Sequence, residues 1–63
     1  MNARGIAQTY DASIGIDKEV VMEWARATLA QGAKYDDEIA ALDSEEMSDL
    51  ADEITAIVLA NFS

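Results

Sequence analysis

The sequence predicts an all-α fold, a small three-helix bundle with an N-terminal arm or short fourth helix. Apolar residues recur at helical spacing in the C-terminal half, two aspartates stand where helix N-caps are expected, and proline is absent. The 63 residues allow one domain, which we expect to span 1–63. Because many of the apolar residues are alanines, we expect a small core and marginal stability without self-association or a partner.

The first helix is expected over residues 17–31. Asp17 is a good N-cap, Ile16 and Val21 occupy the positions of a hydrophobic staple, and Gly32 suits the left-handed residue that follows a helix. A wide apolar arc predicts that this helix is the central one, with Trp24 in the core rather than in a binding hot spot. The arc consists of Val20, Val21, Met22, Trp24, Ala25 and Leu29.

Two further helices are expected over residues 36–42 and 44–61. Acidic residues at the start of the first of these two helices interact favourably with the positive end of the helix dipole. Asp43 and Glu46 have the spacing of a capping box at the start of the second. The second helix carries one apolar stripe, made of Met47, Leu50, Ala51, Ile54, Ile57, Val58 and Phe62.

Residues 1–14 are predicted to form either an arm or a short fourth helix. Ile6, Tyr10 and Ile14 share a helical spacing, whereas Gly5 and Ser13 weaken it. The N-terminus does not have the charged and apolar regions of a signal peptide, and no apolar run approaches the length of a membrane span. We therefore expect a cytoplasmic protein with no membrane partner.

Charge is distributed unevenly along the chain. Thirteen acidic and four basic residues give a net charge of −9, and nine acids without a single base follow Lys34. If helical, residues 36–53 carry roughly one charge per 3 Å, close to roughly one per 3.4 Å along one strand of DNA. This density argues against direct nucleic-acid binding and favours attraction to a basic protein surface.

Catalytic and metal sites are not expected, and neither is a cofactor. The chain has no cysteine and no histidine, which excludes thiolate zinc sites and histidine-dependent di-iron sites. A calcium-binding loop started at Asp36 or at Asp43 would place alanines, or a methionine and a serine, where a ligand and a glycine are required. No base is positioned to activate a serine, so we expect that the protein is not an enzyme.

One short segment resembles a known motif. Leu42-Asp43-Ser44 is similar to the Asp-Ser-Leu motif of acyl and peptidyl carrier proteins, in which the serine opens an acidic helix and carries phosphopantetheine. The resemblance implies attachment at Ser44. However, Glu45 replaces the apolar residue of the motif and only 19 residues follow Ser44. We therefore interpret Asp43 and Ser44 as the cap of a helix.

The leading hypothesis is a non-catalytic module that occludes a basic surface of a partner protein, as an inhibitor, adaptor or nucleic-acid mimic. In composition the chain is similar to small acidic inhibitors of phages and other mobile elements. Tyr35 would either flank the binding face or pack over a helix junction. The candidate partner-binding residues are Tyr35, Asp36, Asp37, Glu38, Glu45, Asp49, Asp52 and Glu53.

The alternative hypothesis is a small helical homo-oligomer or accessory subunit. In that case the apolar arc of the first helix would be the interface, centred on Val21, Met22, Ala25 and Leu29.

Overall fold

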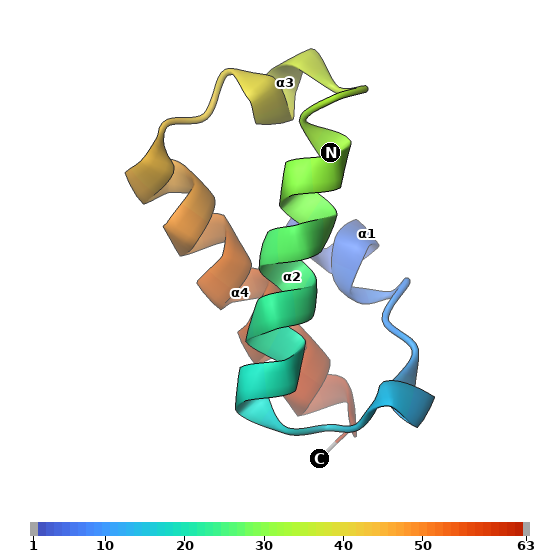
Figure 1. Ribbon diagram of the computed structural model, residues 1–63. Helices are drawn as coiled ribbons and strands as arrows, with labels where there is room; N and C mark the ends of the chain where they lie inside the picture. The colour runs from blue at the N-terminus through green and yellow to red at the C-terminus, as the bar shows by residue number, and fades with distance from the viewer. Residues whose placement is uncertain (1, 63) are drawn as a thin grey trace.

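The computed structural model describes residues 2–62, which form helices joined by short loops, with no strand among them (Figure 1). The elements are α1 (Ala3–Ala7), the 3-10 helix η1 (Ala12–Ile14), α2 (Lys18–Gly32), α3 (Asp37–Ala40) and α4 (Ser44–Phe62). The predicted all-α class is confirmed, and the three predicted helices correspond to α2, α3 and α4. None of these helices is long and apolar enough to cross a membrane.

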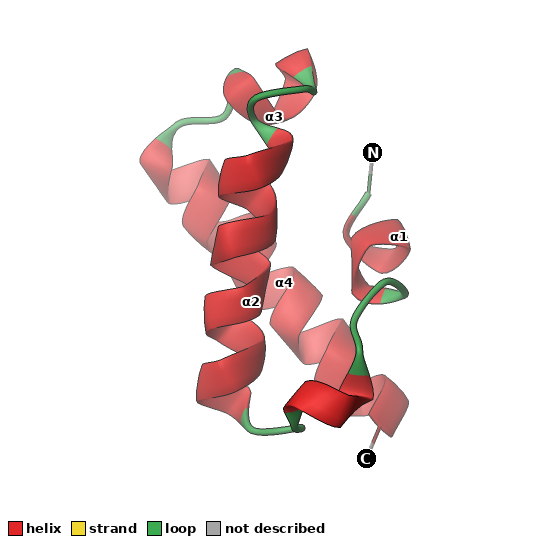
Figure 2. Ribbon diagram, turned by 45° about the vertical axis from the view of Figure 1, so that its right-hand side comes forward, coloured by secondary structure: helices red, strands yellow, loops and turns green. Residues whose placement is uncertain are grey.

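The two long helices form the body of the molecule. α2 and α4 pack against each other in opposite directions, and α3 closes the end where α2 stops and α4 starts (Figures 1 and 2). α1 also packs on α4 (Figure 2). The helix predicted over residues 17–31 packs on both α4 and α3, as a central helix would, but it shares the central position with α4. α4 is the helix that packs on both α1 and α2, because its apolar stripe is long enough to serve both.

Each helix begins at an asparagine or aspartate that accepts a hydrogen bond from a free backbone N–H of the first turn. The predicted capping box of α4 is confirmed: Asp43 Oδ1 accepts from Glu46 N at 2.8 Å, and Glu46 Oε1 accepts from Asp43 N at 3.3 Å. The other caps are Asn2 for α1, Asp11 for η1, Asp17 for α2 and Asp36 for α3. These caps place the helix starts by local chemistry alone.

Gly32 does not play its predicted role. It is the last residue of α2, and within residues 2–62 the one residue with a positive φ is Gly15. A Cβ atom at Gly32 would lie 2.7 Å from Cδ1 of Ile39, whose side chain is 4% exposed. Glycine at this position therefore allows α3 to approach the end of α2 closely, and Ile39 fills the space.

The core is small, as expected, and is shared by four segments. α1 contributes only alanines, Ala3 and Ala7, which let its backbone approach α4 closely. Trp24 is partly buried and packs against the core, so its predicted packing role is confirmed. The buried apolar residues are Ala3, Ala7, Tyr10, Val21, Ala25, Leu29, Ile39, Ala51, Ile54 and Val58.

Tyr10 anchors the N-terminal segment to both long helices. Its side chain is buried, and its ring meets Trp24 of α2 edge-on at a centroid distance of 4.8 Å and Phe62 of α4 at 6.4 Å. Its hydroxyl donates a hydrogen bond to the carbonyl oxygen of Gly15. This bond ties the loop that leads into α2 to the core. Gly15 has φ 123° and ψ 159°, a conformation that is essentially restricted to glycine.

Candidate functional site: the acidic face and the adjoining groove

The predicted partner-binding residues lie on two consecutive helices and on the turn before them. We use the term acidic face for the seven carboxylates among these residues. They are Asp36, Asp37 and Glu38 at the start of α3, and Glu45, Asp49, Asp52 and Glu53 on α4. Six of the seven are exposed, and Asp36 is partly buried.

The four α4 residues of the acidic face lie on the side of the helix that faces away from the core. The buried side of α4 is formed by Ala51, Ile54, Thr55 and Val58. At about 100° per residue, Asp49 and Glu53 lie nearly opposite Ala51. Glu45, Asp49 and Glu53 follow one another at four-residue spacing, so they are neighbours along the helix surface. The result is a continuous row of like charges in the first half of α4.

The three acids of α3 form a second group. Asp36 caps its helix, because its Oδ1 accepts a hydrogen bond of 2.9 Å from Glu38 N. Asp37 and Glu38 follow in the first turn. α3 packs against the end of α2, so this group lies near the α2 C-terminus, whereas the other group is on α4, which packs alongside α2 (Figure 1 shows the helices). The acidic face thus has two parts, and Asp36 has a structural role in one of them.

Tyr35 lies in the turn between α2 and α3 and is 82% exposed. The interpretation in which it packs over the helix junction is therefore wrong. At this junction Ile39 packs against Gly32. Tyr35 remains a candidate contact residue beside Asp36.

Two cations border the acidic face, and the sequence did not predict their position there. Because α2 and α4 run in opposite directions, Lys18 comes to line a depression together with Asp52, and Arg26 lines another together with Ser44 and Ser48. The relevant signal in the sequence is the four-residue spacing of Lys18, Met22 and Arg26 along one edge of α2. On its own this spacing could not indicate that the edge meets α4.

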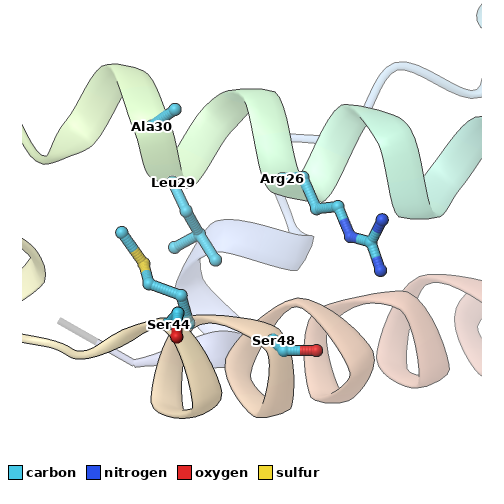
Figure 3. Close-up of a pocket in the computed structure, with 6 residues that line it drawn as sticks. Arg26, Leu29, Ala30, Ser44 and Ser48 are labelled. Carbon is cyan, nitrogen blue, oxygen red and sulfur yellow. The ribbon is translucent and has the colours of Figure 1, made fainter.

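A groove separates the α4 N-terminal half from α2 on this side of the molecule. It encloses about 350 Å³ and is lined by Arg26, Leu29 and Ala30 of α2 and by Ser44, Met47 and Ser48 of α4. Figure 3 shows Leu29 pointing from α2 into the space between the helices and Arg26 extending from α2 toward α4. The floor is apolar, and the polar groups stand at the rim.

The apolar arc of the alternative hypothesis is used inside the monomer. Val21 and Ala25 are fully buried and Leu29 is 2% exposed, while Met22 is partly buried. Val21 and Ala25 pack within the core and are not available as an interface, whereas Met22 and the edge of Leu29 line depressions on the α2–α4 seam. The large apolar side chains that remain exposed lie elsewhere, at Ile14, Ile16, Tyr35 and Phe62.

The chemistry available at the acidic face is electrostatic. Within residues 2–62, no group of three or more acidic side chains is arranged so that it could hold a metal ion. Outside the face, hydrogen bonds from the backbone N–H and the hydroxyl of Ser13 lower the pKa of Asp11 below its usual value of 3.8.

Comparison with known proteins finds no family model, no curated protein and no solved structure that matches this chain.

Proposed function

We propose that this protein is a non-catalytic binding module that docks its acidic face on a basic surface of a partner protein. Occupation of that surface would block other ligands sterically and electrostatically, as an inhibitor or nucleic-acid mimic does. The observation that carries the proposal is the row of exposed carboxylates on α4 and α3, in a half of the chain that contains no base after Lys34.

The fold itself does not need this row. The hydrophobic stripe and the capping box specify α4, and the capping box uses Asp43 and Glu46 rather than the outer acids. Like charges at four-residue spacing destabilise a helix by about 0.2–0.5 kcal/mol per pair. These charges lower the stability of α4 and have no structural role in it. This supports the idea that a positively charged partner compensates for their repulsion.

The proposal is tested by affinity capture with two matched variants. Asp49→Asn/Glu53→Gln neutralises two acids at four-residue spacing on the outer side of α4. Asp11→Asn/Asp17→Asn neutralises two exposed N-cap residues outside the acidic face, where asparagine caps a helix equally well. Both variants change the net charge equally. Each protein is immobilised, exposed to lysate of the source cells and eluted with a salt gradient.

A partner of the acidic face should be retained by the wild type and by the N-cap variant, elute as the salt concentration rises, and be lost from the α4 variant. The eluted protein should itself carry a basic surface. Equal retention by all three columns, or elution that does not depend on salt, contradicts the proposal. Circular dichroism of each variant confirms that the helices are intact.

A further inference from the structure

The groove between α2 and α4 adjoins the acidic face, and together they form a surface with an apolar centre and an acidic border. We infer that the partner contributes an amphipathic helix with basic residues along one edge, and that an apolar side chain of this helix inserts between Leu29 and Met47. This inference rests on the proposed function and specifies the chemistry of the partner.

The shape of the surface favours a helix over a compact ligand. Two further depressions continue the groove along the α2–α4 seam. The first shares Arg26 with the groove, and the second shares Lys18 and Met22 with the first. From Ala30 to Lys18 the seam is about 18 Å long at 1.5 Å per residue. An elongated apolar seam of this length accommodates about three turns of a docked helix.

The volume of the groove is suited to apolar side chains of a partner. Its volume of about 350 Å³ is sufficient for one or two large apolar side chains, and Leu29 and Met47 supply the apolar contacts. Met22 lies further along the seam. Because methionine side chains adapt to differently shaped partners, the two methionines suit a recognition surface of this kind.

Charge decides the identity and the orientation of the occupant. On the α4 side the seam is bordered by Asp52, with Glu45 and Asp49 further out, all exposed. On the α2 side the charges balance, because Lys18 and Arg26 line the depression together with Glu19 and Glu23. A docked helix therefore gains net attraction when its lysines or arginines lie along the edge that faces α4.

The inference is tested with two synthetic helical peptides of about 15 residues. Both carry lysines along one edge and glutamines along the other. The first has leucines in its apolar stripe and the second has alanines, so the charge is identical. The leucine peptide should bind the protein at least about tenfold more tightly, since one inserted leucine accounts for such a ratio.

Two variants of the protein locate the contact. Ala30→Gln places a long uncharged side chain in the groove, and Ala27→Gln places the same side chain on an exposed site of α2 that does not line it. Ala30→Gln should reduce binding of the leucine peptide to the level of the alanine peptide, with an unchanged salt dependence. Ala27→Gln should bind like the wild type.

The outcomes separate the two proposals. If both peptides bind equally and lose affinity with salt and in Asp49→Asn/Glu53→Gln, the groove inference is overturned and the acidic-face proposal stands. If neither peptide responds to salt or to that variant, the acidic-face proposal fails. If light scattering shows a dimer that Ala30→Gln converts to a monomer, a second copy of the chain occupies the groove and the inference is overturned.

Discussion

Replacement of Asp49 by lysine should stabilise the protein and weaken its binding to a basic partner. Asp49 is exposed on α4 and has acidic neighbours on the same helix surface at three- and four-residue spacing in both directions, namely Glu45, Glu46, Asp52 and Glu53. Each like-charge pair costs about 0.2–0.5 kcal/mol, and an opposite-charge pair gains a similar amount. For four pairs, we expect Asp49→Lys to raise the free energy of unfolding by about 1.6–4 kcal/mol at low ionic strength.

The matched control is Asp49→Gln, which removes the repulsion without adding attraction and has a helix propensity close to that of lysine. Urea unfolding, followed by far-ultraviolet circular dichroism, should rank the proteins as lysine above glutamine above aspartate. The differences should shrink at high salt, because screening weakens interactions between exposed charges. Binding of the basic leucine peptide should follow the opposite order.

The reasoning is refuted if Asp49→Lys lowers stability at low salt, because the four neighbouring carboxylates would then not repel Asp49. It is also refuted if stability rises while peptide binding is unchanged, because the charge at position 49 would then not contribute to the binding face.

Three further predictions concern the N-terminal segment. Tyr10→Phe removes the hydroxyl that donates to the Gly15 carbonyl and should lower the free energy of unfolding by about 1 kcal/mol; an unchanged urea midpoint in Trp24 fluorescence would contradict this. Gly15→Ala should destabilise by about 1–3 kcal/mol, because φ 123° strains any residue with a Cβ even though no atom lies within 4 Å of it; a stable alanine variant would refute the strain. Asp11 should titrate below 3.8 in an NMR pH titration, since Ser13 stabilises its charged form, so its contribution to stability is complete above that pH and is lost as pH falls through the lowered pKa; titration at or above 3.8 would contradict it.

The helices could be predicted because their starts depend on neighbours in the sequence. Asp17 and Asp43 each bond to an N–H two or three residues further along, and this arrangement is encoded by spacing alone. The stripe of α4 likewise identifies its buried side without knowledge of what covers it. The fold class and the exposed side of the acidic helix follow from such local rules.

The predictions that failed concern features that are set by how separate helices pack. Gly32 is a residue type that commonly follows a helix end, but its role here is set by Ile39 of α3, which packs where a Cβ atom would lie. Lys18 and Asp52 line one depression although 34 positions separate them. Only the antiparallel packing of α2 on α4 places a cation beside the acidic face and creates the groove.

The carboxylates on α3 and on the first half of α4 affect how the protein is oriented while it diffuses toward a partner. The last nine residues of α4 that the structure describes, 54–62, carry no charge, so the acids crowd toward the end of the molecule closed by α3. The centre of negative charge is therefore displaced from the centre of mass. In the field of a positively charged surface the molecule experiences a torque as well as an attraction. It turns while it diffuses and arrives with the α3 end foremost.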